Sequence, residues 1–477
     1  MPIIIPGNRL ASTGHTISQS IRFNDDDSPY MQRTFGTPTD AKKWTLSAWV
    51  KLHGITDGAT GGVRLLDVGS PAGSEDLLSI GSGYAGYSKI YFWSRTSSSY
   101  DWRLETTAEY RDPSAWMHLT FVFDSDNTLS VERMRLFVNG ERITNFSSES
   151  YPSSGDASRI NTAVEHRIGN TVYSSSNYSN GYAAEMVFID GQALTCDSFG
   201  EFNSSGIWIP KDVSGLTFGN NGYHIDGRDS ADLGDDESGN GNDFSTSGLG
   251  AHDQVLDSPT NNFSTMNPLD NYYFAGTFKD GNLDVTTSGA TGNYTFCTST
   301  QKIPTSGKWY TEVRAYEIGT GCYIGITQEP TTGINVYLGQ LSTTWGYYSD
   351  GRLFTNNSGS SYGNSYTNGD IIGIAVDMDN NKLYFSKGGT FQNSGDPTSG
   401  STGTGAISIT GGVDYFLSMS DDTGGATTVR QMWNFGQDGT FCNGVTAQGN
   451  KDASGIGNFY YSVPSGYKAL CTKNLGS

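Results

Sequence analysis

The sequence predicts an all-β protein with two β-sandwich domains in tandem behind a short N-terminal arm. Apolar residues alternate with polar ones from about residue 20 onward, which is the period of strands with one buried face. Hairpin-turn signals such as Asn139-Gly140 separate these short segments. An acidic stretch rich in Gly and Asn, within residues 226–271, interrupts the alternation near the middle of the chain and indicates a domain boundary.

The arm and the first domain occupy the first half of the chain. Residues 1–20 alternate little, and Ile3-Ile4-Ile5 could add as a strand to a neighbouring subunit or belong to the chain's own first domain. The first domain is predicted to cover residues 21–250, with strands at 44–52, 116–124, 134–138 and 184–188. Asp190-Gly191 marks a second tight turn after the last of these strands.

A linker and the second domain follow. Residues 251–271 are predicted to form the linker, because turn-forming Asp, Asn, Ser and Pro gather there. The second domain is predicted to cover residues 272–477, including a C-terminal tail, with strands at 309–315, 372–376 and 383–385. Each domain then has about 200 residues, which is enough to bury a core of its own.

The composition excludes several other classes of protein. The 477 residues include 62 Gly, 27 Tyr and 23 Phe, a mixture too rich in aromatics for a disordered chain and unlike a coiled coil. Lys and Arg total 29 against 49 Asp and Glu, and this net charge of −20 predicts no nucleic-acid partner. No apolar run approaches the length of about 18 residues that a membrane span needs. The first residues lack the basic segment of a secretory signal.

Five segments of the first half carry a family resemblance. They are Ser20–Phe23 with Ser28–Tyr30, Trp44–Lys51, Trp116–Asp124, Leu136–Gly140 and Gly181–Gly191. Together they resemble the laminin-G-like, concanavalin-type jelly-roll family over most of residues 20–245. The resemblance implies that the first β-sandwich is a jelly roll.

The second half is similar to a SPRY domain, which is also a bent β-sandwich. The segments that carry this similarity are Gly307–Val313, Tyr323–Ile326, Gly369–Asp377, Lys382–Gly389 and Asn434–Gln437. The resemblance implies a second β-sandwich in residues 272–477.

The pairing of the two domains carries a third resemblance. Together with the segments Asp236–Phe244, Asp257–Asn271 and Pro464–Leu475, it resembles virion proteins of tailed bacteriophages, usually tail-fibre or tail-associated adhesins. This resemblance implies a protein of the virion, made in the bacterial host cytoplasm. It also implies contacts with other virion proteins through the N-terminal region, and a homo-oligomer, for which a trimer is our expectation.

The sequence lacks the carboxylate motif of the hydrolases that share this jelly roll. Those enzymes carry E-x-D-x-x-E on one strand, and a retaining mechanism needs two carboxylates about 5–5.5 Å apart. This sequence contains no E-x-D, and Glu185 is alone on its strand. Gly359–Gly363 matches G-x-S-x-G, but in a Ser- and Gly-rich loop rather than at a strand-to-helix turn. We therefore expect no enzyme activity, although carboxylates from different loops remain an alternative.

Metal and disulfide chemistry is weakly indicated. The five cysteines are widely spaced without C-x-x-C, which predicts free, mostly buried thiols of a protein made in a reducing cytosol. Asn24–Asp27 and Asp235–Glu237 offer oxygen ligands of the kind that calcium prefers. The same residue types also favour turns for backbone reasons alone. We expect no cofactor, with calcium as the alternative.

Aromatic residues among Gly and Ser give the best binding signal. Tyr and Trp combine a flat apolar face with a polar tip, which suits sugar rings and protein surfaces. Strand residues that fill the sandwich would show some of the same pattern, as the alternation of Tyr91 and Trp93 indicates. The candidate ligand-binding residues are Tyr84, Tyr87, Tyr100, Trp102, Tyr173, Tyr178, Trp345, Tyr347, Tyr348 and Tyr362.

These observations favour binding over catalysis. The leading hypothesis is a virion adhesin that binds a host-surface glycan or protein through its β-sandwich domains. The alternatives are a structural fibre, decoration or connector protein that contacts other virion proteins, and a polysaccharide depolymerase. Aromatic loops buried against neighbouring subunits would favour the structural role, whereas a cleft with paired carboxylates would favour the enzyme.

Overall fold

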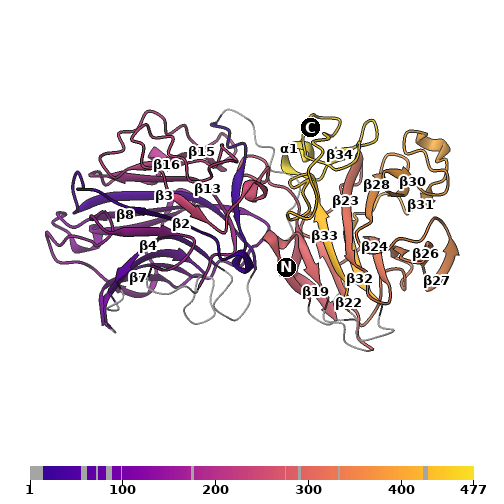
Figure 1. Cartoon of the computed structure of the whole chain (residues 1–477), viewed down its shortest axis with the longest axis horizontal. Coiled ribbons are helices and arrows are strands. Elements are labelled where there is room, and N and C mark those ends of the chain that lie inside the picture. The colour runs from indigo at the N-terminus through magenta and orange to yellow at the C-terminus, as the bar shows by residue number, and fades with distance from the viewer. Residues whose placement is uncertain are drawn as a thin grey trace. The chain divides into compact units, whose positions relative to one another are not determined.

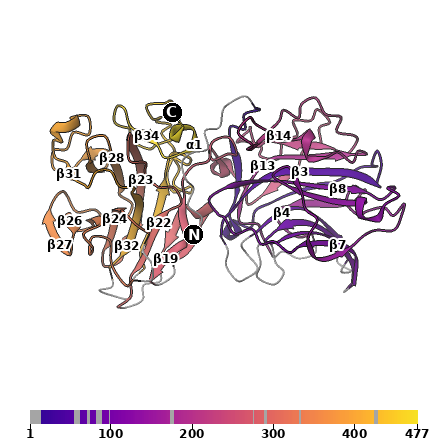
Figure 2. The same cartoon turned by 180° about the vertical axis from the view of Figure 1, so that it is seen from behind.

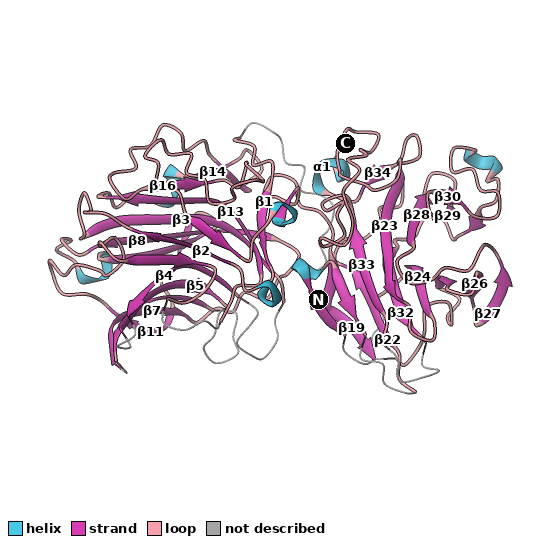
Figure 3. Cartoon of the chain, viewed as in Figure 1, coloured by secondary structure: helices cyan, strands magenta, loops and turns pink. Residues whose placement is uncertain are grey.

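The computed structural model describes residues 14–54, 62–70, 74–81, 89–97, 99–172, 177–273, 276–287, 292–330, 334–422 and 428–476. Strands dominate these ranges. The helices described there are short: α1 (Thr472–Leu475) and the 3-10 turns η1 (Asp25–Asp27), η2 (Ser130–Glu132), η3 (Cys196–Ser198), η4 (Ala251–Asp253), η5 (Asp280–Asn282) and η6 (Gly400–Thr402). The predicted all-β fold is confirmed (Figure 3).

The chain divides into two compact units between Asn261 and Asn262, inside the predicted linker. Both units extend into that linker, because β18 (Gln254–Val255) pairs within the first unit and β19 (Met266–Tyr273) pairs within the second. Figures 1 and 2 label strands of both units from opposite sides. The predicted linker therefore holds strands of two sandwiches.

The first unit has two large sheets in which the paired strands run antiparallel. The first sheet has the order β10 (Glu141–Arg142), β9 (Met134–Val138), β8 (Trp116–Asp124), β3 (Lys43–Leu52), β13 (Gly181–Asp190), β1 (Ser20–Phe23) and β18, with β16 (Tyr223–Ile225) paired to β13. The second has the order β11 (Phe146–Ser150), β7 (Ser99–Thr106), β6 (Ile90–Thr96), β5 (Ser74–Ile80), β4 (Val63–Ser70), β12 (Glu165–Ile168), β2 (Tyr30–Thr34) and β17 (Ser245–Ser247).

The core of the first unit lies between these sheets. Alternate residues of each strand point inward, so apolar side chains of facing strands meet there. Trp44 of β3 stacks on Phe123 of β8 with ring centroids 5.4 Å apart, and it packs at 5.6 Å against Phe92 of β6. The alternating apolar residues that predicted the strands therefore form this core.

The central strands β3 and β13 are buried on both faces. Ser47 of β3 points away from the core, yet it is only 2% exposed. The small hairpin of β14 (Gly200–Phe202) and β15 (Trp208–Pro210) belongs to a segment that covers this outer face, where Trp208 clusters with Trp49 and Ile17. Polar residues that alternation would place in solvent are therefore interior here.

The described part of the predicted arm packs on the first unit. Ile17 is 3% exposed, the His15 backbone N–H donates to the Pro210 carbonyl at 3.2 Å, and Ser20 already belongs to β1. Residues 1–13 lie outside the described residues, and so does the strand hypothesis for Ile3-Ile4-Ile5. Residues 14–20 therefore continue the first sandwich.

The second unit also has two sheets. One has the order β19, β22 (Thr295–Ser299), β32 (Phe416–Asp421), β24 (Cys322–Thr327), β25 (Thr344–Tyr348), β26 (Arg352–Thr355) and β27 (Ser358–Ser361). The other has the order β20 (Thr277–Lys279), β21 (Asp284–Thr286), β33 (Arg430–Asn434), β23 (Lys308–Glu317), β28 (Ile371–Asp377), β29 (Lys382–Lys387) and β30 (Thr390–Phe391), with β31 (Ile407–Ser408) on β29 and β34 (Lys468–Ala469) on β23.

A late segment of the second unit covers β23. The pair β34–β23 is parallel, and the Glu312 carboxylate of β23 accepts the backbone N–H groups of Tyr460 and Tyr461 at 2.7 and 2.8 Å. Glu312 is 0% exposed, so its hydrogen bonds form in the interior. Because of this segment, much of the outer face of β23 is also buried.

Candidate functional site

The predicted aromatic residues fall into three groups. Tyr84, Tyr87 and Tyr173 lie outside the described residues. Four others are core residues: Trp102, Trp345, Tyr347 and Tyr362 are 4%, 6%, 0% and 8% exposed. Their expected position in exposed polar loops is wrong, because they point into the sandwich cores. The remaining three, Tyr100, Tyr178 and Tyr348, lie at least partly on the surface.

Tyr100 of β7 is the most exposed of the three, at 41%. Its ring stands edge-on to the Trp93 ring of β6, with centroids 5.7 Å apart and planes at 85°. The Arg103 guanidinium lies 4.4 Å from the Tyr100 ring, and the Arg95 guanidinium lies 5.1 Å from the Trp93 ring. We call Trp93, Arg95, Tyr100 and Arg103 the β6–β7 aromatic face.

Strand register explains this arrangement. Trp93 pairs with Arg103, and Arg95 pairs with Tyr100, so ring and guanidinium alternate across the two strands. Such cross-strand neighbours are close enough for direct contact. Arg95 also forms an ion pair with Glu75 of β5 at 2.7 Å, which fixes its guanidinium. The result is an exposed tyrosine ring that contacts Trp93 and Arg103.

Tyr178 and Tyr348 are half-buried. Tyr178 lies between Asn177 and Ser179, whose backbone carbonyl and hydroxyl hold Arg64 of β4. The Tyr348 ring lies 4.6 Å from the Tyr323 ring, and its hydroxyl donates to the Asp422 carboxylate at 2.6 Å. Burial, the largest cause, raises the pKa of Tyr348 well above its usual range. The Tyr348 side chain therefore takes part in local packing.

A buried serine and histidine resemble a hydrolytic pair on the outer face of β3 and β8. The Ser47 hydroxyl lies 2.8 Å from His118 Nε2. The Trp208 indole, which can only donate, gives its N–H to His118 Nδ1 at 3.1 Å. The imidazole proton must therefore lie on Nε2, and Ser47 accepts it. Burial lowers the pKa of His118 to about 3, so the ring stays neutral and cannot take a proton from Ser47.

Two carboxylates meet on the outer face of β4 and β5. Arg64 Nη1 contacts Asp67 Oδ2 at 3.2 Å and Glu75 Oε1 at 3.9 Å, so the two carboxylates share one guanidinium. Burial, followed by the neighbouring Glu75 charge, raises the pKa of Asp67 well above its usual range. Asp67 and Glu75 are only 0% and 3% exposed and both contact Arg64, whereas the two carboxylates of a glycosidase must reach a sugar chain. The sequence did not point to this pair, because its members lie on different strands with no motif spacing.

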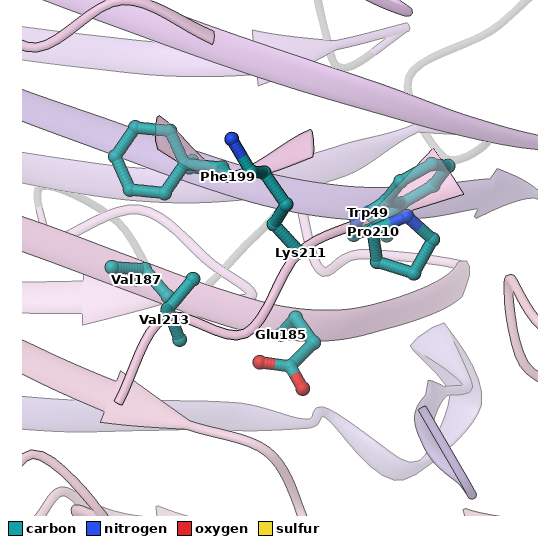
Figure 4. A pocket seen from close by; sticks show the side chains of 8 residues that line it. Trp49, Glu185, Val187, Phe199, Pro210, Lys211 and Val213 are labelled. Carbon is teal, nitrogen blue, oxygen red and sulfur yellow. The ribbon is translucent and has the colours of Figure 1, made fainter. Parts of the chain in front are cut away.

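Glu185 lies beside a small pocket on the outer face of β13 (Figure 4). It adopts φ +47° at an irregularity in the strand register, and its carboxylate contacts His15 Nε2 at 2.9 Å and His224 Nε2 at 2.5 Å. Burial alone would raise the pKa of Glu185, but the two histidines hold it at about 2. Figure 4 shows Trp49 and Lys211 among the side chains around the pocket.

The size of this pocket limits what it could bind. Its cavity volume is about 10 Å³, which is space for about one water molecule. Ligand pockets usually begin at roughly 300 Å³. The pocket therefore suits water or a very small group rather than a sugar ring.

The acidic turns use their carboxylates on the protein itself. Asn24 and Asn180 donate their amide N–H groups to Asp27 and Asp25 at 3.1 and 2.8 Å. Asp236 accepts backbone N–H groups of the second acidic turn, including that of Asn242 at 2.8 Å. Within the described ranges, no three His, Cys, Asp or Glu side chains are grouped so that they could hold a metal ion.

The cysteines and helices add little chemistry. All five cysteines are free, as predicted, and all but the half-buried Cys442 are buried. In the part of the chain that the structure describes, no helix has the length and apolar character needed to cross a membrane.

Family models match both units. The model for the concanavalin A-like lectin/glucanases superfamily matches residues 25–197, and the model for the SPRY domain matches residues 308–405. These matches confirm the expected pairing of the two domain types. Each match lies within one of the two units.

Curated relatives share only short stretches with the chain. It is 39% identical over 59 residues to the dual specificity protein kinase splA of Dictyostelium discoideum, which is 12% of this chain and 2% of the kinase. It is 32% identical over 132 residues to Ran-binding protein 10 of Danio rerio, which is 26% of this chain and 22% of that protein. The chain therefore spans less than a quarter of the length of these curated relatives.

Solved SPRY structures are also similar to part of the chain. The SPRY domain of human HERC1 is 16% identical, with 35% of this chain and 96% of that chain covered at a TM-score of 0.29. The TRIM65 PSpry domain is 12% identical, with 36% and 89% covered at a TM-score of 0.26.

Proposed function

Because the chain joins a concanavalin A-like domain to a SPRY domain, we propose that it is a binding protein that acts without catalysis. Domains of these two types mediate binding to glycans or proteins in general. The finer part of the proposal is that the chain is a tailed-phage virion adhesin for a host-surface glycan or protein. That part rests on the sequence resemblance of the whole chain, since the family matches concern the domains alone.

The exposed Tyr100 ring is the observation that carries this proposal. Trp93 and Arg103 hold the ring before any ligand arrives, so little side-chain freedom is lost on binding. A flat ring can pack against the C–H face of a sugar, while the neighbouring guanidinium groups can donate to hydroxyl or carbonyl oxygens. Tyr and Arg are also the residue types that dominate binding energy at protein interfaces.

The chemistry of the interior supports a role without catalysis. Trp208 fixes His118 in the tautomer that cannot activate Ser47. Asp67 and Glu75 are both buried and both contact Arg64, so neither is open to a sugar chain. We also propose that binding needs no cofactor, because Asn24 and Asn180 already donate to the acidic turn where calcium was the alternative.

The proposed partners follow from the same resemblance. We propose that the protein is located in the virion, contacts other virion proteins through its N-terminal region and forms a homo-oligomer. Weak sites repeated over the copies of such an oligomer would gain avidity without any new contact.

Host-cell binding by the labelled full chain tests the proposal. We expect Tyr100→Ala to weaken binding by about ten-fold or more. Phe202→Ala is the matched control, because Phe202 is an equally exposed aromatic of the same unit, at 49%, outside the β6–β7 aromatic face. Equal binding by wild type and Tyr100→Ala would refute the assignment of the site.

Two further measurements separate the alternative functions. Release of reducing ends from host polysaccharide by the purified chain would establish a depolymerase instead. Labelling of intact particles with an antibody against the chain tests the virion location. A chain that is found between other virion proteins, with no affinity for host cells, would be a structural component.

A further inference from the structure

Arg314 of β23 has no carboxylate partner in the described parts of the chain. Its Nη1 contacts the Met432 sulfur at 3.8 Å, which is a weak acceptor, and its buried Nε has no hydrogen-bond partner. Neighbouring arginines of the same unit are paired: Arg430 with Asp284, and Arg352 with Asp350 at 2.7 Å.

Tyr316 is an exposed aromatic residue beside the Arg314 guanidinium. The side chain is 40% exposed and lies where the register of β23 against β33 shifts by one residue. The Arg314 guanidinium lies 5.1 Å from its ring centroid, and the Arg430 guanidinium lies 4.5 Å from it. Because Asp284 neutralises Arg430, the charge that remains beside the ring is that of Arg314.

A strained turn holds the Arg314 side chain in place. Phe441, Cys442 and Asn443 adopt φ values of 49°, 55° and 62°, three left-handed residues in succession, which L-residues rarely adopt. Phe441 is 0% exposed and clusters with Met432, which anchors the turn on β33. Strain of this kind persists only where the surrounding structure enforces it, and it concentrates at functional sites.

Gly444 leaves the space that Arg314 occupies. A Cβ atom on Gly444 would lie 2.0 Å from Arg314 Nη1, a distance that real contacts do not allow. The guanidinium therefore fits beneath the backbone of this glycine. A larger residue at position 444 would displace it.

We propose that Arg314 and Tyr316 bind the carboxylate of an acidic sugar residue, such as a uronic acid. The guanidinium can donate a charge-assisted hydrogen bond to a carboxylate, and the exposed ring offers a surface for the C–H face of the pyranose. This site lies in the second unit, apart from Tyr100. The inference that the ligand is a sugar rests on the proposed function. The inference that it carries a carboxylate rests on Arg314 alone.

Titration of the full chain with methyl glucuronide, followed by ligand-observed NMR, tests the site. We expect saturable binding of methyl glucuronide and binding at least about ten-fold weaker for neutral methyl glucoside, which lacks the carboxylate. An acetylated aspartyl dipeptide is the second probe. If the dipeptide binds as well as the glucuronide, the assignment to a sugar is wrong.

Three variants and a matched control connect the binding to Arg314. Arg314→Met, which keeps the apolar stem, is expected to lose at least about ten-fold in affinity. Arg314→Lys and Gly444→Ala should show intermediate losses and keep the test valid if Arg314→Met fails to fold. Arg352→Met is the control, because Arg352 also lies over an aromatic ring, at 4.7 Å from Phe354, but is paired with Asp350.

The outcomes also separate this site from the proposed function. Absence of saturable glucuronide binding, or equal binding by wild type and all three Arg314 and Gly444 variants, would overturn the proposal. Tyr100→Ala should retain glucuronide binding. A wild-type chain that binds glucuronide but has no affinity for host cells would refute the adhesin role and leave this site standing.

Discussion

The ion pair between Lys51 and Asp257 provides the sharpest test of how the first unit is stabilised. Lys51 Nζ lies 2.6 Å from Asp257 Oδ2, and both side chains are 0% exposed. The Trp116 indole N–H donates to the other carboxylate oxygen at 3.0 Å. Asp257 belongs to the segment that follows β18, so this pair attaches the end of the first unit to β3.

The magnitude follows from the geometry. At 2.6 Å and an effective dielectric constant of about 20, the attraction is about 6 kcal/mol, which the desolvation of two ions largely offsets. Asp257→Asn keeps the shape but leaves the Lys51 ammonium in the interior without this carboxylate. We therefore expect it to lower the free energy of unfolding of the first unit by about 3–5 kcal/mol.

Guanidinium unfolding of the full chain, followed by circular dichroism and tryptophan fluorescence, measures this loss. The double variant Lys51→Met/Asp257→Leu replaces both charges by apolar groups and should recover most of the stability. A loss below about 1 kcal/mol in Asp257→Asn, or a double variant as unstable as the single one, would refute the reasoning.

Three other predictions concern titration, a buried carboxylate and calcium. The pKa of His15 is raised, chiefly by its hydrogen bond to Glu185, and that of His224 is raised because the same carboxylate outweighs burial. The stability that these two histidines contribute is complete below their unfolded pKa of about 6.5 and is lost as the pH rises through their folded pKa values. Glu185→Gln should therefore lower the Tm more at pH 5.5 than at pH 9. An equal loss of Tm at both pH values would contradict this. Glu312→Gln removes one acceptor for the backbone N–H groups of residues 460–461. We expect the free energy of unfolding to fall by about 1–3 kcal/mol and proteolysis at this segment to become faster. Unchanged cleavage kinetics would contradict this prediction. Chelation with EDTA should leave the Tm unchanged, because amide donors already occupy the carboxylates of the first acidic turn. A Tm that falls on chelation and returns with calcium would refute the proposal that no cofactor is needed.

Strand positions could be predicted because alternation is a local property. The predicted strands at 44–52 and 116–124 correspond to β3 and β8, and the predicted turn at Asn139-Gly140 has φ values of 48° and 82°, both positive as its type requires. Apolar residues at every second position can bury one face only as strands. This part of the fold was therefore available from the sequence alone.

The face of the sheet on which an individual side chain lies could not be predicted in the same way. Tyr100 and Trp102 are two positions apart on β7 and would share a face in a regular strand. The register shifts between Ser94 and Arg95 of β6, so Asp101 is an extra residue, and Tyr100 points outward while Trp102 enters the core. A bulge of this kind depends on tertiary pairing, which the pattern of one strand does not contain.

The Arg314 site was equally invisible to sequence reasoning. Its relevant property is that no carboxylate among the described residues pairs with it, and that depends on which distant segments surround it. Arg430 lies on β33 and Gly444 follows the left-handed turn, both more than a hundred positions away in sequence. Only the folded sheet brings these residues to one place.

In each unit, one strand of the first- or second-unit sheets pairs with a strand that is synthesised much later. In the first unit β1 pairs with β18, and in the second β23 pairs with β34. At roughly 5–20 residues per second, about 13–50 s pass before residue 255 is made, and β1 has no β18 to pair with until then. Each sandwich therefore completes its folding late in its own synthesis. A chain terminated before residue 468 would have a second unit whose β23 lacks its parallel neighbour.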